Sequence, residues 1–410
     1  MKIARMRIAF FLDQSFPPDS RVENEAYSLI QAGHEVHLFS LNFKKLKPKE
    51  TTVNGIKVYR QKAGWLLYKS SALVYEWKYY HKKLENPIRK FIESVKPDVL
   101  HVHDMLIAKA VMDVNDRYFQ LPLTLDLHEN RPEIMQYYPH LQKFPAKKLV
   151  KIELWKAAQN ELIKRADHVV MVTPEAIDVA GADIGEPNDK FTAVANTISP
   201  EIYWNYPIDK KVVRKFKKGF DIVYVGDTGL RRGTDTAIRA LKMVADQIPE
   251  AQLVLVGKST EDEQLRDLVS ELGLSAHVLF EGWQDVSKFP SYIKGAEVCI
   301  SPLHRNLHHD TTLANKLFQY MAGGRPIITS DCPAQVSVIK EAKAGLIFEA
   351  GNAQQMAELL IGLYNNPSLA SELGDNGKKA VEEKFNWNET SKELISYYSS
   401  LEEKINSPSS

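Results

Sequence analysis

Glycines and arginines follow a short apolar run in the second half of the chain, in the stretch YVGDTGLRRG. Gly226, Gly229 and Gly233 allow a tight turn there, and Arg231 and Arg232 add two guanidinium groups. Glycine lets the backbone approach a ligand closely, and guanidinium groups match the geometry of phosphate oxygens. The stretch therefore predicts a phosphate-binding loop, although a glycine turn with two solvated arginines would look the same in sequence.

Two further segments are candidates for phosphate contact. Asn315 and Lys316 begin the helix predicted within LANKLFQYMAGGRPIITSD, and the free N–H groups at a helix start favour an anion. Lys258 follows the apolar run QLVLVG, and ligands of doubly wound sheets bind at the carboxyl ends of strands. A solvated loop lysine is the alternative interpretation of Lys258.

Histidines mark two strand ends in the first half of the chain. His103 and Asp104 end the run VLHVHD, and His128 and Glu129 follow the run LTLDL. We interpret His101, on the same strand as His103, as a core residue. A lone histidine after a strand is often structural, but its charge changes near neutral pH, so these positions are also candidates for contact with a charged substrate.

Short apolar runs alternate with helical patterns along the whole chain. This alternation predicts buried parallel sheets, and so two doubly wound α/β domains. The helix after the first run shows a predicted capping box at Ser20 to Glu23 and ends near Gly33. The predicted strands are RIAFFL, EVHLFS, VLHVH, LTLDL, HVVMV and TAVAN in the first half, and DIVYV, QLVLV, HVLF, EVCIS, PIIT and GLIF in the second.

Changes in pattern suggest the domain limits. A first domain is expected over residues 1–200, followed by a lysine-rich linker with a proline over 201–218 and a second domain over 219–386. The last helical pattern, about 387–405, is expected to pack back on the first domain.

Composition excludes several classes of protein. The 53 basic and 52 acidic side chains nearly cancel, so no overall field favours nucleic acid. Only two cysteines are present, which suggests neither a disulfide framework nor a zinc site and fits a reducing cytoplasm. No apolar run is long enough to span a bilayer, and no strand leads into a G-x-G-x-x-G or Walker loop. We therefore expect a cytoplasmic protein, neither a nicotinamide nor a P-loop enzyme.

The segments together resemble a known family. LANKLFQYMAGGRPIITSD and YVGDTGLRRG resemble the nucleotide-sugar half of GT-B glycosyltransferases, specifically glycosyltransferase family 4, also called glycosyl transferases group 1. FPPDSRVENEAYSLIQAGHEVHLFS, LHVHD and LDLHENRPE resemble the first half of the same family, in the same order. The resemblance implies the GT-B fold, with two Rossmann-like domains facing across a cleft that holds the donor.

The resemblance also implies an activity. It is transfer of a sugar from a nucleotide-diphosphate sugar to a hydroxyl of a saccharide or lipid-linked acceptor, with retention of configuration and without metal or cofactor, in polysaccharide or glycolipid synthesis. His128 and Arg232 would be catalytic. The implied donor-phosphate contacts are Gly226, Gly229, Arg231, Arg232, Lys258, Asn315 and Lys316. Contacts to ribose or sugar would come from Gln319, Thr311 and Asp310, and acceptor-side contacts from Ser20, Arg21, His103 and Glu129.

Three departures from the family pattern fall on functional positions. Gln319 and Thr311 stand where members usually carry two glutamates, and Asp227 stands where the phosphate loop carries an arginine. Glutamine can still hydrogen bond to a ribose, but threonine is too short to replace the glutamate, so His309 or Asp310 is expected to substitute for it. The departures leave two alternatives open: a GT-B protein that binds without catalysing, and a sugar-nucleotide epimerase, which would need acid and base carboxylates.

Two segments of the first domain combine aromatic residues with lysines. They are WLLYKSSALVYEWKYYHKKL and KFPAKKLVKIELWK. Such a combination suits the headgroup region of an anionic bilayer, which predicts peripheral membrane contact through this domain. The alternative is that the aromatic residues fill the core while the lysines solvate a helix.

Overall fold

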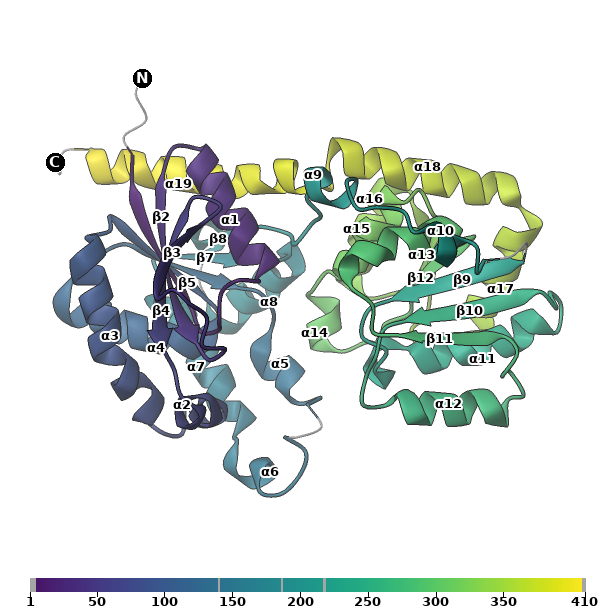
Figure 1. Cartoon of the computed structure of the whole chain (residues 1–410), viewed down its shortest axis with the longest axis horizontal. Coiled ribbons are helices and arrows are strands. Elements are labelled where there is room, and N and C mark those ends of the chain that lie inside the picture. Colours follow the sequence, from purple (N-terminus) through teal and green to yellow (C-terminus); the bar gives the residue numbers. More distant parts are fainter. Residues whose placement is uncertain (1–4, 139–140, 186, 217–218, 408–410) are drawn as a thin grey trace. The chain divides into compact units, whose positions relative to one another are not determined.

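The computed structural model describes residues 5–138, 141–185, 187–216 and 219–407. It divides the chain into two units (Figure 1): unit 1 comprises Met1–Ala195 and Ser391–Ser410, and unit 2 comprises Asn196–Thr390. Each unit is one largely parallel sheet with helices on both faces, so the predicted pair of doubly wound α/β domains is confirmed. In the part of the chain described, no helix has the length and apolar character needed to cross a bilayer.

Unit 1 contains an eight-stranded sheet in the order β3-β4-β2-β1-β5-β6-β7-β8, in which only β3 is antiparallel to its neighbour. The sequence runs predicted as strands all form strands here. The hairpin of β3 and β4 was not predicted, although Asn54-Gly55 at its turn, both with positive φ, is a strong hairpin signal. The strands are β1 Arg7–Leu12, β2 Glu35–Asn42, β3 Glu50–Val53, β4 Ile56–Lys62, β5 Val99–His103, β6 Leu123–Leu127, β7 His168–Met171 and β8 Phe191–Ala193.

The two faces of this sheet differ in character. Helices α3, α4 and α7 pack on one face over aliphatic and aromatic side chains. Helices α1 and α19 contribute side chains that bond to His101 and Thr124 on the other face. The helices are α1 Ser20–Gln31, α2 Trp65–Ser70, α3 Tyr79–Val95, α4 Met105–Tyr118, α5 Arg131–Met135, α6 Ala146–Leu149, α7 Ile152–Arg165, α8 Pro174–Ile184 and α19 Trp387–Asn406, with 3-10 turns at Ser71–Leu73 and Asn188–Lys190.

The start of α1 corrects one sequence prediction. Asp19, not Ser20, is the N-cap: its carboxylate accepts from the Val22 N–H at 3.1 Å, and its own N–H donates to Glu23. A carboxylate at this position satisfies a free donor and favours the positive end of the helix dipole.

Unit 2 contains a six-stranded parallel sheet in the order β11-β10-β9-β12-β13-β14. Every strand here was predicted, because each is a short apolar run bounded by turn residues. The strands are β9 Phe220–Val225, β10 Ala251–Val256, β11 Val278–Gly282, β12 Val298–Ser301, β13 Ile327–Ser330 and β14 Gly345–Phe348.

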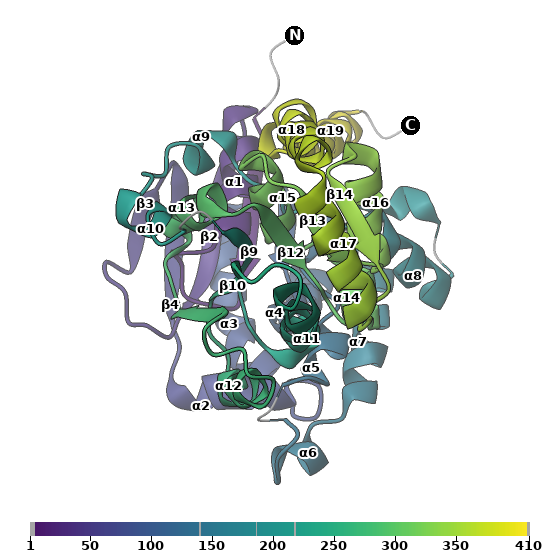
Figure 2. The same ribbon diagram turned by 90° about the vertical axis from the view of Figure 1, so that its right-hand side faces the viewer.

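Two hydrophobic clusters cover the faces of the second sheet, and Figure 2 shows its strands with helices packed around them. Helices α11, α12 and α17 form one cluster, and α13, α15 and α16 form the other. The helices are α9 Pro200–Tyr203, α10 Lys210–Val213, α11 Thr234–Ala245, α12 Asp262–Glu271, α13 Phe289–Gly295, α14 Leu307–Asp310, α15 Asn315–Ala322, α16 Pro333–Ala342, α17 Ala353–Asn365 and α18 Pro367–Glu383, with 3-10 turns at Leu230–Arg232 and Val286–Lys288.

The segment expected to be a linker packs on unit 2. Tyr203 and Val212 are buried in one of its clusters, and the Tyr203 hydroxyl donates to the Gln319 carbonyl at 2.9 Å. At the other end of the chain, α19 begins in unit 2 and continues into unit 1, where Tyr397 and Tyr398 bond to Thr124 and His101.

Candidate active site

Two glycines, one in the loop after β9 and one in the loop after β10, leave no room for a side chain. Gly233 has φ +71, and a Cβ there would lie 1.7 Å from the Pro302 carbonyl oxygen. Gly257, after β10, has φ +159, and its Cβ would lie 1.7 Å from the Gly226 oxygen. The loops after β9, β10 and β12 therefore contact one another backbone to backbone, which fixes the position of Arg231 and Arg232 between Gly229 and Gly233.

Two N–H groups of this loop are already bonded to carboxylates. The Gly229 N–H donates to Asp227 Oδ1 at 3.1 Å, and the Leu230 N–H donates to Glu261 Oε2 at 2.7 Å. The sequence predicted that the backbone at these glycines approaches a phosphate closely. In this structure, an anion would instead be bound by the cationic side chains of the loop and by the start of α15.

The two predicted arginines converge on one histidine and one carboxylate. Arg231 Nη1 and Arg232 Nη1 lie 3.2 and 3.4 Å from His309 Nε2, and both guanidinium groups lie near Asp227 Oδ2, at 3.1 and 3.6 Å. His309 Nδ1 lies 2.8 Å from the His304 carbonyl, which makes Nε2 the acceptor. Burial together with Arg232 lowers the pKa of His309 to about 3, so this ring is neutral and orients the arginines.

Lys316 brings a third cation to the same loop. It is buried, its Nζ lies 3.5 Å from the centre of the Tyr224 ring, and a Cβ at Gly226 would lie 3.4 Å from that Nζ. The Nζ forms no hydrogen bond with any residue that the structure describes. Burial and the neighbouring Arg232 hold the pKa of Lys316 well below its ordinary value. A negatively charged ligand would supply the missing partner.

The start of α15 completes this cation-rich site. Its N-cap is Ala314, which offers no side-chain cap, so no side chain of the N-cap accepts from the first amides of the helix. Backbone N–H groups at such a start favour an anion, and Lys316 stands in the same turn. Asn315 itself is exposed, as is Lys258 after β10.

The residues predicted to contact ribose or sugar are held in different ways. Gln319 is buried on α15, one turn after Lys316. The Thr311 hydroxyl donates to the Leu307 carbonyl at 2.7 Å, and both Asp310 oxygens pair with Arg305, at 2.6 and 2.9 Å. Asp310 is therefore already engaged by a cation in this structure.

In unit 1, His128 lies between two carboxylates. Its Nε2 is 2.8 Å from Asp126 Oδ2, its Nδ1 is 3.4 Å from Asp104 Oδ2, and its backbone N–H donates to Asp104 Oδ1. Burial disfavours the charged ring, but Asp104 and Asp126 outweigh it and raise the pKa of His128 to about 10. The ring is therefore an imidazolium at neutral pH, a fixed positive charge at the carboxyl edge of the sheet.

Asp104 and Asp126 are themselves fixed by the fold. Asp104 precedes α4 with φ 60 and ψ 172, a strained conformation for a residue with a side chain, which costs of order 1–3 kcal/mol. Arg21 from α1 holds Asp126 with two bonds, at 2.7 and 3.0 Å. With His128 and Arg21 beside it, the pKa of Asp126 stays well below its ordinary range despite burial.

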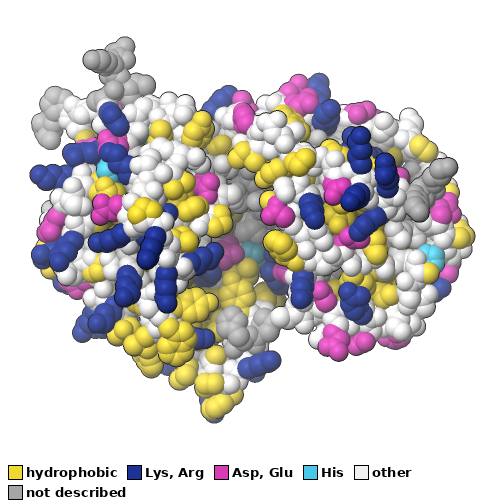
Figure 3. Space-filling view, in the orientation of Figure 1, with side chains coloured by type: hydrophobic (Ala, Val, Ile, Leu, Met, Phe, Trp, Pro, Cys, Tyr) yellow, Lys and Arg dark blue, Asp and Glu magenta, His cyan; other side chains and the backbone are white. Residues whose placement is uncertain are grey.

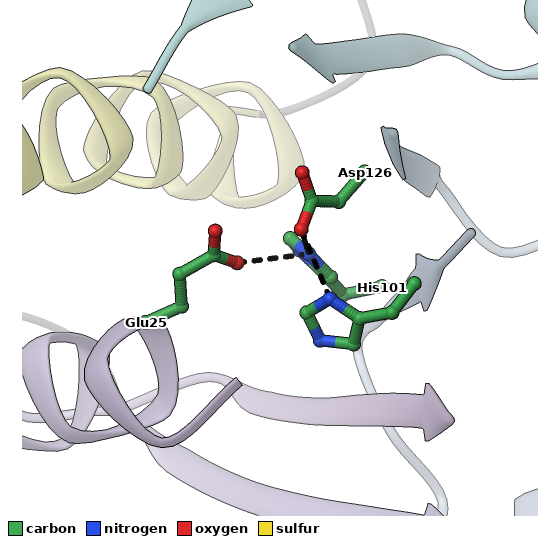
Figure 4. Close-up of side chains that lie close together, drawn as sticks. Glu25, His101 and Asp126 are labelled. Atoms are coloured by element: carbon green, nitrogen blue, oxygen red, sulfur yellow. Dashed lines mark hydrogen bonds and ion pairs between the residues drawn. The ribbon is translucent and has the colours of Figure 1, made fainter. Parts of the chain in front are cut away.

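The polar network extends from Asp126 to the face of the sheet that α1 and α19 cover. Figure 4 shows Glu25 of α1 pointing toward His101, with Asp126 on the other side; Glu25 Oε2 is 3.4 Å from His101 Nε2. His101 Nδ1 lies 2.7 Å from the Tyr398 hydroxyl of α19, and His103 Nδ1 lies 3.0 Å from Asp126 Oδ2.

Glu25, His101, His103 and Asp126 bring potential metal-ligand atoms within 4.8 Å of one another. A guanidinium group already lies among them, because Arg21 Nη2 is 2.9 Å from Glu25 Oε1 and 2.7 Å from Asp126 Oδ1. A divalent cation would be repelled by this buried positive charge. The guanidinium group also already neutralises the carboxylates that would have to bind such a cation. We therefore interpret the cluster as an ion-pair network that supports His128.

This network changes the interpretation of the predicted acceptor-side residues. Arg21 and His103 are buried and bonded internally, so in this structure they support Asp126 and are not exposed to an acceptor. Ser20 is exposed at the start of α1, and Glu129 Oε1 lies 3.4 Å from Arg131 Nε. Sequence reasoning named no role for Asp126; the signal for it was that Thr124 and Asp126 alternate on β6 in phase with His128, which directly follows the strand.

Comparisons with known proteins agree with this geometry. The family described as "Glycosyltransferase Family 4" matches residues 20–202, and "Glycosyl transferases group 1" matches residues 205–380. Together the two matches span most of both units. One glycosyltransferase family model thus matches each half of the chain, and the chain is a glycosyltransferase.

Individual relatives support the same assignment. An uncharacterized glycosyltransferase of Methanocaldococcus jannaschii is 21% identical over 390 residues, 91% of each chain. A phosphatidyl-myo-inositol mannosyltransferase of Mycobacterium leprae is 27% identical over 171 residues, 42% of this chain and 44% of that one. The crystal structure of HepE from Anabaena in complex with UDP superposes with a TM-score of 0.71 at 14% identity, covering 96% and 100% of the two chains. This glycosyltransferase therefore has the GT-B fold, as predicted.

Proposed function

We propose that this glycosyltransferase moves a sugar from a nucleotide-diphosphate sugar to a hydroxyl of a saccharide or lipid-linked acceptor, with retention of configuration and without a metal ion. The acceptor class follows the relative that is named for phosphatidyl-myo-inositol, and the donor class follows the UDP complex of HepE. The setting would be synthesis of a cell-surface polysaccharide or glycolipid, in the cytoplasm or at the inner face of the membrane.

The observation that carries this proposal is the cluster of Arg231, Arg232 and Lys316 beside the uncapped start of α15. Loss of a nucleotide diphosphate places negative charge on phosphate oxygens in the transition state. Prearranged positive groups stabilise that charge without reorganising, and removing one such group typically costs about 2.7–4 kcal/mol. Arg231 and Arg232 would provide this stabilisation without a metal, together with Lys316, whose charged form a bound anion would favour.

His128 supplies a second fixed charge in the proposed reaction. Because both ring nitrogens pair with carboxylates, the imidazolium cannot accept a proton from the acceptor. Its role would be electrostatic and positional, at the donor sugar and phosphate. The phosphate leaving group itself would then take the acceptor proton.

The test begins with donor binding. Nucleoside diphosphates and nucleotide sugars, with UDP and UDP-glucose first, are screened by thermal shift, since a ligand at about 100 times its Kd stabilises by roughly 2.7 kcal/mol. Arg232→Ala should remove most of the shift and of the turnover with any accepted donor. Arg239→Ala is the matched control, because Arg239 is exposed on α11 of the same unit. Equal behaviour of the two variants would refute the phosphate site.

Turnover separates the proposal from its main rival, a protein that binds donor without transferring sugar. Thr311 and Asp310 favour that rival, since the former is bonded within its own helix and the latter is paired with Arg305. Binding without sugar transfer to any acceptor would establish it. NMR of the product anomer tests retention, activity in EDTA tests metal independence, and release of an isomerised nucleotide sugar would indicate an epimerase.

A further inference from the structure

Two segments of unit 1 expose large apolar side chains together. Trp65 is 72% exposed and Phe144 is 80% exposed, the largest exposed fractions among the apolar side chains of this unit that the structure describes as exposed. We call the surface they form the basic apolar face. Its apolar members, all exposed, are Trp65, Leu66, Tyr68, Trp77, Phe144 and Leu149.

Contacts between the segments make this one surface. The Tyr75 ring packs edge-on against Trp155 with centroids 5.0 Å apart, and the Lys151 N–H donates to Glu76 Oε1 at 2.8 Å. Figure 3 shows the apolar side chains gathered over α2 and α6, with lysines and arginines around them. The structure therefore separates two alternatives that composition left open: Tyr80 and Trp155 fill the core, but Trp65 and its neighbours face outward.

The charge on this face has one sign over a long stretch. Residues 134–152 contain no aspartate or glutamate, and the exposed lysines of the face are Lys69, Lys143, Lys147, Lys148 and Lys151. A cavity of about 450 Å³ opens among them, lined by apolar groups such as Met135 and Ile152, by Lys147, Lys148 and Lys151, and by one carboxylate, Glu153, so that the lysines outnumber it. Aromatic side chains suit the headgroup depth of a bilayer, and lysines attract anionic headgroups by about 1 kcal/mol each near the surface.

The face is also linked to the candidate active site. Helix α5 begins at Arg131, whose Nη2 is 3.6 Å from Asp104 Oδ2, and ends at Met135, which lines the cavity. Five helical residues span only about 7 Å. A lipid held at this face would therefore lie close to the edge of the sheet that carries His128.

We propose that the basic apolar face binds an anionic lipid bilayer and that its lysine-rimmed cavity receives a phosphate headgroup. The inference rests on the proposed transfer to a lipid-linked acceptor, but binding of the face to a bilayer needs neither donor nor catalysis. Exposed tryptophan and phenylalanine would enter the headgroup region, while the lysines meet the anionic surface.

The test is co-sedimentation of the whole chain with vesicles of phosphatidylcholine alone and of phosphatidylcholine with phosphatidylglycerol. Binding should require the anionic lipid and should fade between about 0.01 and 0.15 M salt, over which the screening length falls from about 30 to 8 Å. Changing Lys147, Lys148 and Lys151 together to glutamate should weaken binding about tenfold or more. Lys340, Lys378 and Lys379 of unit 2, all exposed, changed together to glutamate, give a control with the same net charge.

Apolar contact is tested separately with Phe144→Ser and Trp65→Ser, which remove exposed groups and so leave the fold intact. Each should reduce binding to anionic vesicles at every salt concentration. No anionic preference in the parent chain, or equal loss in the unit 2 control, would overturn the proposal. So would concentration-dependent self-association that Phe144→Ser abolishes in the absence of lipid, since the face would then bind a second copy. Arg232→Ala should bind vesicles normally, so a failed donor site and a failed membrane face give different results.

Discussion

The charge of His128 leads to a prediction about Asp104. Replacing Asp104 by asparagine keeps the shape of the side chain and removes its negative charge. The imidazolium then keeps only Asp126 as a carboxylate partner, at 2.8 Å, while Arg21 and burial continue to oppose its charge. The pKa of His128 should fall from about 10 toward neutrality.

The size of this change follows from the distance. Asp104 Oδ2 is 3.4 Å from His128 Nδ1, and an opposite charge within about 4–6 Å changes a pKa by about 1–3 units. One unit corresponds to about 1.36 kcal/mol, so the carboxylate accounts for about 1.4–4 kcal/mol of preference for the charged ring. Because folding raises this pKa, the stabilisation is complete below about 6.5 and disappears as the pH rises toward about 10. In Asp104→Asn the stabilisation should be smaller, and its loss, which again begins near pH 6.5, should be complete at a pH closer to neutral.

NMR titration of the histidine ring signals measures the pKa directly, with His128→Asn to assign the resonance. The pH profile of kcat/KM gives the second readout: the parent should keep its activity from about pH 7 to 9, and Asp104→Asn should lose it over that range. Asp104→Glu should restore part of the pKa, which a purely structural role would not predict.

Asp116→Asn is the matched control, since it removes an exposed carboxylate from the same helix, α4. A His128 resonance that titrates near 6.5 in the parent chain would refute the imidazolium assignment. Equal effects of Asp104→Asn and Asp116→Asn would show that Asp104 acts only through overall charge.

Two further predictions concern unit 2. Gln319→Ala should weaken binding of a bare nucleotide and of its nucleotide sugar by similar factors if this side chain serves the ribose, and isothermal titration that finds unchanged affinity for both would show that the helix position has another role. Gly233→Ala should lower the free energy of unfolding by more than about 2 kcal/mol, because the new Cβ would lie 1.7 Å from the Pro302 oxygen and the backbone there has φ +71. Gly362→Ala is the control: this glycine lies on α17 with nothing within 4 Å of the added Cβ, so the substitution should raise the free energy of unfolding by about 0.5–1 kcal/mol. Denaturant titration measures both changes.

Local sequence patterns were sufficient to predict most of the fold. Buried parallel strands appear as short apolar runs, and each run predicted as a strand became one, from RIAFFL to GLIF. The β3–β4 hairpin was missed because neither strand is a continuous apolar run: β3 reads ETTV and β4 reads IKVYRQK, although Asn54-Gly55 between them indicated a hairpin. The N-cap of α1 was displaced by one residue because Asp19 and Ser20 are both good caps, and only the backbone geometry distinguishes them.

The candidate site was predicted less completely, because its chemistry depends on contacts between distant segments. Sequence reasoning named Arg231, Arg232, Lys316 and His128, but it could not show that Glu261 and Asp227 occupy the loop amides or that Arg21 is buried against Asp126. The exposed aromatic residues of the basic apolar face illustrate the same limit. Trp65 and Trp155 both lie near lysines in the sequence, and only tertiary packing buries one and exposes the other.

The departures from the family pattern make sense when the charges of unit 2 are considered together. Asp227 replaces an expected arginine and lies 3.1 and 3.6 Å from the two guanidinium groups, so a diphosphate would have to compete with it for Arg231 and Arg232. The competing charge is limited to Asp227, because His309 is neutral and contacts both arginines without adding a second negative charge. Lys316 lies against an aromatic ring and has no hydrogen-bond partner among the described residues, so a diphosphate gains most from this cation. The loss of one family cation is thus offset by the buried lysine, whose charged form only a bound anion would stabilise.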